Sequence, residues 1–377
     1  MIYDAIVIGS GPGGAVAAAT LAQQGKSVLL ADRQAFPRDK VCGDGLPIHV
    51  MLMLHEMGID VRKAGIDYHR VTSLSIEAPS GRTLTTHEVS EDVFSMTATR
   101  MSFDLALHRK AIENGAKFEM MNITKPLMDG NRVVGVVERR DKTLIEHEAK
   151  VVIAADGASS ALARTVRGRV QDADKTAVSI RAYGVLKKPM PPCVYFYFPR
   201  DLIPGYAWIF PSANGRCNIG VYLHNREYKA RTEGLETLLK QFSERMQAEF
   251  PHEILSETAQ TWQLPLFTDK QVRHVPGMMF VGDAGQFVNA ITGGGIYPAM
   301  LTGRAAAQTA LEVLDGTATE AAYEPRWQQA VGGSLGTAWL IKQYVASNAA
   351  VFNGIFWLAT LPVLRAPVLR AMSGEHY

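Results

Sequence analysis

A glycine-rich segment near the start of the chain has the spacing of a dinucleotide-phosphate site. It reads Gly9-Ser10-Gly11-Pro12-Gly13-Gly14 and lies between a short apolar stretch and a stretch of small residues. Glycines at these intervals permit a tight turn and let backbone N–H groups approach a pyrophosphate, and a helix N-terminus adds favourable partial charge. The alternative is a glycine-rich turn that serves packing alone. The residues predicted to bind phosphate are Gly9, Gly11, Gly13 and Gly14.

An acidic residue follows at the distance that such a site requires. Asp32 ends the second apolar stretch, eighteen residues after Gly14. A carboxylate there would bind a ribose diol and would repel a 2′-phosphate, so the pattern favours an unmodified adenosine ribose.

A second constellation, far downstream, favours FAD over NAD. Met279-Phe280-Val281-Gly282-Asp283 is an apolar run that ends in Gly-Asp, and Gly293-Gly294-Gly295-Ile296 follows after nine residues. Asp283 can bind the ribityl chain, while the glycines offer N–H groups to the electron-rich edge of a flavin and would stabilise charge on the reduced ring. A nicotinamide dehydrogenase needs no such second clamp. The predicted flavin-site residues are Gly282, Asp283, Gly293, Gly294, Gly295 and Ile296.

Apolar periodicity supplies the elements that would position these residues. Strands over 5–8 and 28–31 around a helix over 13–24 form a βαβ unit, and a buried strand over 278–281 leads into a helix over 297–314. Aromatic and β-branched stretches predict a second sheet. Further elements are predicted as helices over 103–114 and 235–249 and as strands over 118–123, 132–138, 143–148, 151–155, 194–198, 207–210 and 217–223.

The order of these elements predicts an α/β protein with interleaved domains. A Rossmann-like FAD-binding domain would comprise 1–72, 98–170 and 270–320. An antiparallel β-sheet domain that binds substrate would comprise 73–97 and 171–269, followed by a C-terminal helical region over 321–377.

Composition narrows the class of protein. The 377 residues carry 39 Lys and Arg against 37 Asp and Glu, without a run of five like charges, so we expect no nucleic-acid partner. The three cysteines form neither a disulfide framework nor a zinc site, which favours a reducing compartment. The first residues show no basic region or cleavage site, and we expect a cytoplasmic protein.

One segment near the C-terminus raises the question of membrane contact. Residues 343–364 carry no charged side chain and have about the length of a bilayer span. Polar residues and a proline interrupt the segment, so we predict a buried or membrane-grazing helix rather than a span, with peripheral membrane contact through this region.

Over nearly its whole length, the chain resembles the p-hydroxybenzoate hydroxylase-like FAD superfamily and, within it, the geranylgeranyl reductase family. The match is carried by the N-terminal glycines, by Ala98-Thr99-Arg100-Met101-Ser102-Phe103-Asp104, by Ala155-Asp156-Gly157 and by Gly282-Asp283. The resemblance implies an FAD-binding domain of the p-hydroxybenzoate hydroxylase and glutathione reductase type. It implies that Arg100 contacts the FAD pyrophosphate, where the alternative is a surface charge at a helix start. Asp156 and Gly157 would lie near the flavin and any incoming nicotinamide, and the remaining implied cofactor contacts are Arg33, Cys42, Gly43 and Ile123.

Three stretches favour the reductases over other families of the same superfamily. They are Lys40-Val41-Cys42-Gly43-Asp44-Gly45, Tyr206-Ala207-Trp208-Ile209-Phe210-Pro211 and the segment Asn289 to Ile296. The second resembles the family's Tyr-x-Trp-x-Phe-Pro, which implies substrate contacts for Tyr206, Trp208 and Phe210. Halogenases carry a related Trp-x-Trp-x-Ile-Pro, from which this chain departs at Tyr206 and Phe210. The chain also departs from the reductases at Ala290, where proline is usual and would add rigidity.

Cysteines and aromatic residues leave two interpretations open. The resemblance places Cys42 beside the flavin, where a thiol could donate a proton to a reduced alkene or gate flavin movement, or could be an inert buried side chain. Cys193 and Cys217 are interpreted as core residues. The alternating aromatic residues from Tyr195 to Phe210 form either an apolar tunnel wall or ordinary sheet core.

The resemblance implies an FAD-dependent reductase that passes a hydride from reduced flavin to carbon–carbon double bonds of an isoprenoid or other apolar substrate. The alternatives are an FAD-dependent monooxygenase, acting as hydroxylase or epoxidase, a halogenase, and a flavoprotein that carries lipid without catalysis. Because the chain has one dinucleotide fingerprint, electrons must come from transiently bound NAD(P)H or from a separate electron-donor protein.

Overall fold

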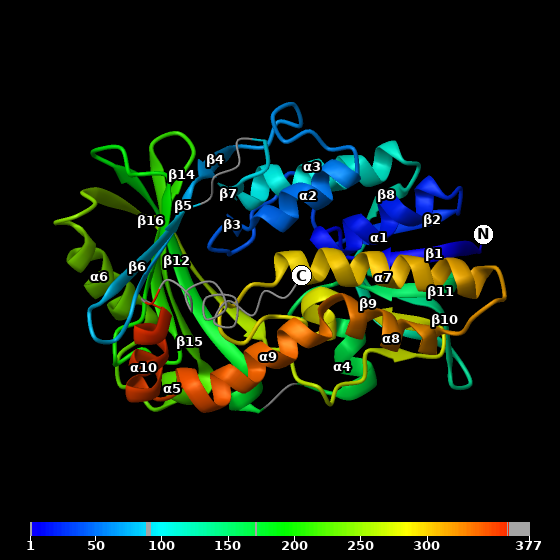
Figure 1. Ribbon diagram of the computed structural model, residues 1–377. Helices are drawn as coiled ribbons and strands as arrows, with labels where there is room; N and C mark the ends of the chain where they lie inside the picture. Colours follow the sequence, from blue (N-terminus) through cyan, green and yellow to red (C-terminus); the bar gives the residue numbers. More distant parts are fainter. Residues whose placement is uncertain (1, 88–91, 170–171, 360, 362–377) are drawn as a thin grey trace.

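A mainly parallel eight-stranded sheet organises the glycine-rich segments of the chain (Figure 1). The computed structural model describes residues 2–87, 92–169, 172–359 and 361. The sheet has the order β17-β18-β11-β1-β2-β8, and β9 and β10 extend it from β11 as antiparallel neighbours. Its strands are β1 (Tyr3–Ile8), β2 (Val28–Asp32), β8 (Lys117–Met120), β9 (Ile123–Asp129), β10 (Arg132–Arg140), β11 (Thr143–Ala154), β17 (His274–Val275) and β18 (Met278–Phe280).

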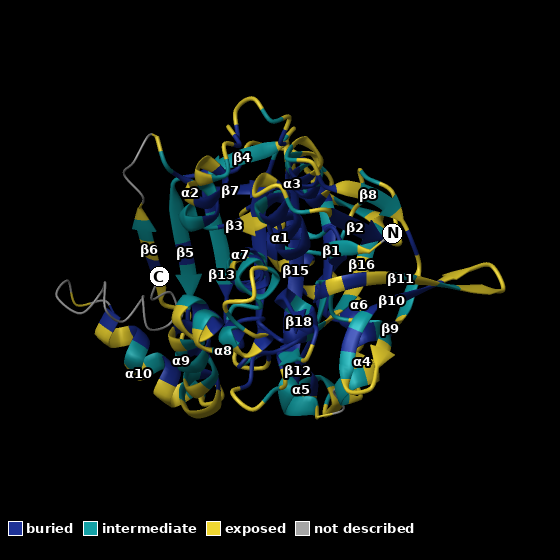
Figure 2. Cartoon of the chain, turned by 90° about the vertical axis from the view of Figure 1, so that its right-hand side faces the viewer, coloured by how far each residue is buried: buried dark blue, intermediate teal, exposed yellow. Residues whose placement is uncertain are grey.

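Both faces of this sheet are covered, as an apolar parallel sheet requires. Alternate residues of β1 enter two different clusters, with Ala5 and Val7 in one and Ile6 and Ile8 in the other. The first cluster packs under the helices, and the second packs under β10 and α4. Figure 2 shows α1 and β18 dark blue at the centre of the molecule. The helices concerned are α1 (Pro12–Gln23), α3 (Arg100–Glu113), α4 (Ala161–Arg167) and α7 (Ile296–Leu314).

A seven-stranded sheet forms the other half of the molecule. Its order is β16-β12-β15-β14-β13-β5-β6, and every pairing is antiparallel except that of β5 with β13. Helix α6 (Leu235–Met246) packs on one face through an apolar cluster. The strands are β5 (Ser73–Glu77), β6 (Thr83–His87), β12 (Thr176–Leu186), β13 (Cys193–Tyr197), β14 (Tyr206–Ser212), β15 (Arg216–His224) and β16 (His252–Pro265).

Shorter elements connect the two large sheets. A three-stranded antiparallel sheet has the order β3-β7-β4 and packs beside α2. Its strands are β3 (Gly45–Leu46), β4 (Tyr68–Val71) and β7 (Ser95–Ala98), and the neighbouring helix is α2 (Ile48–Glu56). The short helix α5 (Asn225–Lys229) follows β15.

The C-terminal region forms a bent helical arm along the seven-stranded sheet (Figure 1). Wide π-helical turns at Gln328–Gly332 and Lys342–Ala346 separate its helices, which are α8 (Tyr323–Trp327), α9 (Gly333–Ile341) and α10 (Ala349–Ala359). Within the ranges that the structure describes, no helix is both long enough and apolar enough to cross a bilayer. The predicted helix over 343–364 is helical as far as 359 apart from a break at 347–348, and 360 and 362–364 lie outside the described residues.

Most predicted elements are confirmed within a few residues, and the main differences concern β11, α3 and β16. The strands predicted over 143–148 and 151–155 are one strand, β11, which pairs with β10 through its first half and with β1 through its second. Helix α3 begins at Arg100 rather than at 103. Sequence patterning does not predict β16, because this edge strand is mostly polar and half-exposed. The domain boundaries stay a prediction, and part of the predicted C-terminal region lies outside the described residues.

Candidate functional site

The carboxyl ends of four parallel strands bring the predicted cofactor motifs together. Gly9 follows β1, Asp32 ends β2, Asp156 follows β11 and Gly282 follows β18. These strands are neighbours in the order β18-β11-β1-β2, so their ends share one edge of the sheet. Ligands of open α/β sheets bind in the crevice outside this edge.

The glycine-rich turn shows which of its glycines serve packing. A Cβ on Gly9, where φ is +95°, would overlap the Ala155 carbonyl oxygen, and a Cβ on Gly14 would overlap the Gly9 carbonyl oxygen. At Gly11 the nearest heavy atom would be Arg38 Nη2, 3.8 Å away. Packing therefore requires three glycines, namely Gly9, Gly13 and Gly14, whereas Gly11 leaves room for a ligand.

The N-terminus of α1 is available to an anion. Gly11 is the residue before the helix, and no side chain among the described residues caps its N–H groups. Unpaired N–H groups at a helix start favour a phosphate. The geometry of this turn fits the pyrophosphate of FAD.

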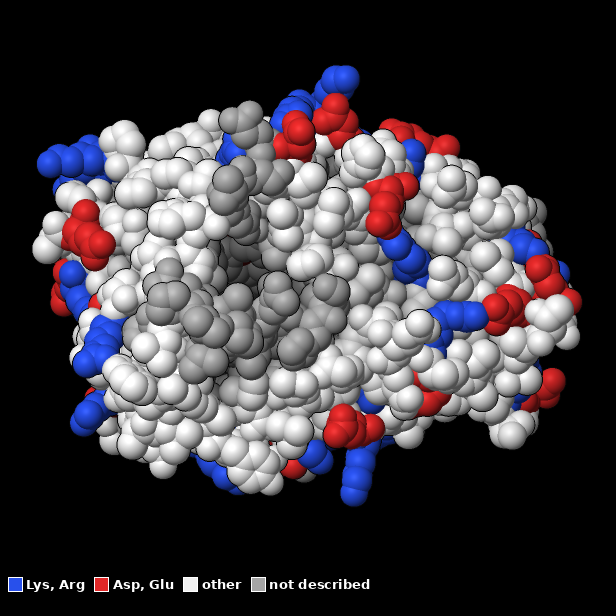
Figure 3. Space-filling view, in the orientation of Figure 1, with Lys and Arg blue, Asp and Glu red and all other residues white. Residues whose placement is uncertain are grey.

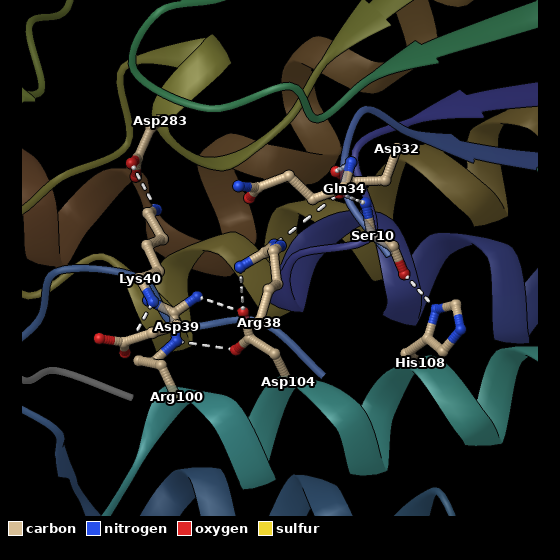
Figure 4. Close-up of polar contacts among 10 residues, drawn as sticks. All are labelled: Ser10, Asp32, Gln34, Arg38, Asp39, Lys40, Arg100, Asp104, His108 and Asp283. Carbon is tan, nitrogen blue, oxygen red and sulfur yellow. Dashed lines mark hydrogen bonds and ion pairs between the residues drawn. The ribbon is translucent and has the colours of Figure 1, made fainter. Parts of the chain in front are cut away.

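Backbone hydrogen bonds fix the carboxylate of Asp32 at the end of β2 (Figure 4). It is buried, and its carboxylate accepts hydrogen bonds from the backbone N–H groups of Ser10 at 2.8 Å and Gln34 at 3.0 Å. The Ser10 hydroxyl in turn bonds His108 Nδ1 at 2.8 Å. Arg33 is exposed beside it, and Ile123 begins β9 at the same end of the sheet.

Arg100 is a buried cation rather than a surface charge. It is 2% exposed and forms two hydrogen bonds of 2.7 Å with the carboxylate of Asp104, which also accepts from Arg38 at 3.2 Å (Figure 4). Burial opposes its charge, but the Asp104 carboxylate raises the pKa of Arg100, so the guanidinium stays protonated. The sequence motif alone assigns Asp104 no role, although its spacing of four residues from Arg100 on a helix predicts that the two side chains meet.

The Asp156-Gly157 segment borders a second cavity of about 410 Å³. Asp156 Oδ2 accepts from the Ala161 N–H at 2.9 Å, and burial raises the pKa of this carboxyl. Gly157 has a φ of +80° and faces open space. Charged side chains that line this cavity are Arg33, Arg164, Arg167, Arg169 and Asp283.

The glycine loop before α7 faces the main cavity. Asp283 forms an ion pair of 3.2 Å with Lys40, and a Cβ on Gly295 would lie 3.3 Å from Asp283 Oδ1. Gly293 has a φ of +64°, and its Cβ would press on the ring of Tyr222 at 3.0 Å. No side chain in the described ranges caps the N-terminus of α7 at Gly295. A helix start without a side-chain cap fits the electron-rich edge of a flavin. Gly282, Gly294 and Ile296 complete the loop and the helix start.

The main cavity has a volume of about 550 Å³ and an aromatic wall. Strand β14 presents alternate residues to it, and these are the predicted substrate residues Tyr206, Trp208 and Phe210. Phe196 of the neighbouring strand β13 and Phe198, just after that strand, also line it. Tyr195 and Tyr197 point to the opposite face, where they pack on Phe250 and Phe242. The aromatic residues therefore divide between a cavity wall on one face of the sheet and packed core on the other.

A polar network fixes the Cys42 segment beneath this wall. Trp208 Nε1 donates to Asn218 Oδ1 at 2.9 Å, and Asn218 Nδ2 donates to the Cys42 carbonyl and to Asp44 Oδ2, both at 2.9 Å. A Cβ on Gly43 would lie 3.3 Å from Trp208 Nε1. Burial raises the pKa of the Cys42 thiol, so it stays protonated. Asn218 lies 176 residues from Cys42, and nothing in the sequence marks the pair.

The structure also locates the two other cysteines and Ala290. Cys193 and Cys217 are buried in β13 and β15, as predicted. Ala290 is buried, and its carbonyl accepts from the Tyr222 hydroxyl at 3.3 Å.

Comparisons with known proteins agree with this geometry. The family described as "FAD binding domain" matches residues 2–325. Digeranylgeranylglycerophospholipid reductase 2 of Methanopyrus kandleri is 30% identical over 351 residues, which cover 88% of this chain and 84% of that protein. Menaquinone reductase of Mycobacterium tuberculosis is 30% identical over 322 residues, which cover 81% of this chain and 76% of that protein.

A solved structure shares the whole fold. It is a geranylgeranyl bacteriochlorophyll reductase-like protein from Thermoplasma acidophilum, with a TM-score of 0.87 at 23% identity. The match covers 100% of this chain and 96% of that chain.

Proposed function

Because the chain belongs to the FAD binding domain family and, within it, to the geranylgeranyl reductases, we propose that it reduces carbon–carbon double bonds of an isoprenoid chain. The protein is an FAD-dependent oxidoreductase. The observation that carries the proposal is the aromatic cavity, which meets the glycine loop and the uncapped start of α7. An isolated alkene must be held close to the hydride donor with water excluded, and this cavity supplies such a setting.

The described residues divide the binding of FAD among them. Gly11 and the start of α1 would hold the pyrophosphate together with Arg100, and Asp32 would hold the ribose. Asp283 would bind the ribityl chain, while the loop over 293–295 and the start of α7 would face the flavin edge. Bound FAD, once reduced, supplies the hydride.

The substrate proposal rests on the relatives and on the wall of the cavity. The relatives are named for a digeranylgeranyl glycerophospholipid and for menaquinone, and both molecules carry isoprenoid chains. The shared part fits an apolar cavity lined by Tyr206, Trp208 and Phe210. We therefore assign the isoprenoid chain, rather than the head group, to this cavity.

The second cavity favours an anionic electron donor. Four arginines line it, and none of them forms an ion pair with a carboxylate in the part of the chain that the structure describes. NAD(P)H and an acidic donor protein both carry the matching charge. With NADPH as donor, Arg164→Ala should slow flavin reduction while leaving reduction by dithionite unchanged. Equal NADPH rates in the two proteins would point to the donor protein.

The C-terminal arm supports peripheral contact with a lipid surface. Leu340, Tyr344 and Trp357 are 55%, 68% and 50% exposed, and the same arm lines the main cavity through Ile341 and Ile355. Exposed apolar residues gathered on one surface mark an interaction site. In Figure 3 the surface over α9 and α10 is mostly uncharged, and the face is hollowed beside it.

One anaerobic experiment tests the reductase. The protein is reduced with dithionite, a geranylgeranyl lipid is added, and the oxidised-flavin absorbance is followed together with the product mass. Return of the band with a product heavier by two hydrogens is the expected result. Return only on admission of oxygen would favour the monooxygenase, and a halide-dependent product would favour the halogenase. A flavin that no donor reduces would indicate the carrier.

A further inference from the structure

Asp44 has three features that the proposed cofactor and substrate contacts do not explain. It lines the main cavity but is 0% exposed, and its Oδ1 has no hydrogen-bond partner among the described residues. Its φ is +64°, a left-handed backbone that residues other than glycine rarely adopt. Buried carboxylates are normally fully bonded, and backbone strain collects at functional sites. The combination marks Asp44 as a candidate for chemistry.

The other carboxylate oxygen is held firmly. Asp44 Oδ2 accepts from the Tyr183 hydroxyl at 2.5 Å and from Asn218 Nδ2 at 2.9 Å. The backbone N–H of Asp44 donates to Cys42 Sγ at 3.3 Å. With Oδ2 and the backbone both fixed, Oδ1 is the position on Asp44 that remains for a proton.

The surroundings of Asp44 favour its protonated form. The titratable and charged groups that face it are Cys42 on its own segment, Arg100 of α3, and Arg181 and Tyr183 of β12. Burial outweighs the hydrogen bonds and the two arginines, and it raises the pKa of Asp44 to about 6. Burial also raises the pKa of the Cys42 thiol, so Asp44 is the stronger acid of the two.

We propose that Asp44 is the proton donor for alkene reduction at this site. The inference rests on the proposed function, in which a hydride from reduced FAD reaches one alkene carbon. The π electron pair then forms the second C–H bond with the proton of Asp44 Oδ1, whose O–H bond breaks. The flavin is oxidised, the alkene is reduced by two hydrogens, and the carboxylate that remains is reprotonated from water.

Side chains of β12 lie between Asp44 and a partly exposed carboxylate. The Tyr183 hydroxyl bonds the carboxylate, and Arg181 stacks on the Tyr183 ring at 4.4 Å. Arg181 in turn pairs at 2.6 Å with Asp39, which is partly exposed.

The test compares Asp44→Asn with Asp141→Asn. The amide has the shape of the carboxylic acid and keeps an acceptor for Tyr183, but it carries no transferable proton. Asp141 is a matched control, because it also has a left-handed backbone, with φ of +55°, and is exposed at the tip of the β10–β11 hairpin. In anaerobic single turnovers with geranylgeranyl lipid, we expect Asp44→Asn to keep its FAD and to slow flavin reoxidation by about 100-fold or more. Asp141→Asn should match the wild type.

Two measurements without turnover separate a proton donor from a structural residue. Infrared difference spectra should show a protonated carboxyl band in the wild type at pH 5 that Asp44→Asn lacks and Asp141→Asn retains. Because the folded pKa is raised, the stability that the wild type draws from this group is lost as pH rises through about 6. We therefore expect Asp44→Asn to melt above the wild type at pH 8, with the difference shrinking at pH 5. A purely structural role would lower its melting temperature at both pH values.

The outcomes distinguish the two proposals. If the wild type is active and Asp44→Asn reoxidises within a few-fold of it, Asp44 is not the donor. A larger loss in Cys42→Ser than in Asp44→Asn would assign the proton to the thiol and overturn the inference. The absence of the infrared band would also overturn it. If the wild-type flavin is not reoxidised by the lipid at all, the proposed function itself fails.

Discussion

Packing does not require a glycine at position 11, so we attribute this glycine to ligand binding. We expect Gly11→Val to fold, because its backbone angles are open to other residues and the nearest atom to a new Cβ is 3.8 Å away. The added side chain would occupy the place of the pyrophosphate, so the purified variant should be colourless. Flavin absorbance per protein and the melting temperature of the apoprotein check both statements.

Gly234→Val is the matched control for Gly11→Val. Gly234 also precedes a helix, α6, with φ of −76°, and a Cβ there would meet nothing within 4 Å. This variant should keep its FAD. A yellow Gly11→Val, or a colourless Gly234→Val, would contradict the phosphate assignment.

The pair Arg100–Asp104 predicts a stability effect that depends on the cofactor. Asp104→Asn leaves a buried guanidinium without its carboxylate, which costs about 3–5 kcal/mol of unfolding free energy. A bound pyrophosphate would restore a negative partner, so added FAD should raise the melting temperature of this variant more than that of the wild type. Thermal melts with and without FAD measure the difference. Equal shifts would separate Arg100 from the pyrophosphate.

At the scale of elements, β14 has one face that lines the cavity and one that packs in the core. Phe210 faces the cavity, whereas Ile209 points into the core beneath α6. We expect Phe210→Ala to raise the KM for the lipid with a small effect on folding. Ile209→Ala should cost about 2–5 kcal/mol of stability and leave the KM near its wild-type value. Steady-state kinetics and denaturant titrations of both variants test whether the cavity-facing residue of β14 serves substrate binding and the core-facing residue serves stability.

The elements also show how far sequence reasoning reaches. The glycine turn, Asp32 and Asp283 were predictable because their signals are local, a strand followed by glycines and an acid. Asp44 depends on Tyr183 and Asn218, which lie 139 and 174 residues away, and only the pairing of β12 with β15 brings them together. Strand β16 escapes prediction for the related reason that its polar sequence is explained by its place at a sheet edge.

At the scale of the whole molecule, the position of the C-terminal arm predicts binding to vesicles. Replacing Leu340, Tyr344 and Val351 with serine removes exposed apolar side chains. We expect the triple variant to sediment less with phospholipid vesicles than the wild type. Leu144→Ser is the control, because Leu144 is equally exposed on the β10–β11 hairpin. A similar loss of vesicle binding in both variants would show that binding depends on exposed apolar surface in general rather than on the arm.

The β10–β11 hairpin has a practical consequence. It projects from the end of the molecule opposite α10 in both ribbon views, and its tip at Asp141 is exposed (Figures 1 and 2). The residues that line the main cavity are scattered along the sequence between Pro12 and Ile355, and none of them belongs to the hairpin. An affinity handle inserted at this tip would anchor the enzyme to a solid support with the arm and the cavity turned toward the bathing solution, so that lipid could be supplied in flow and the flavin read out on the support.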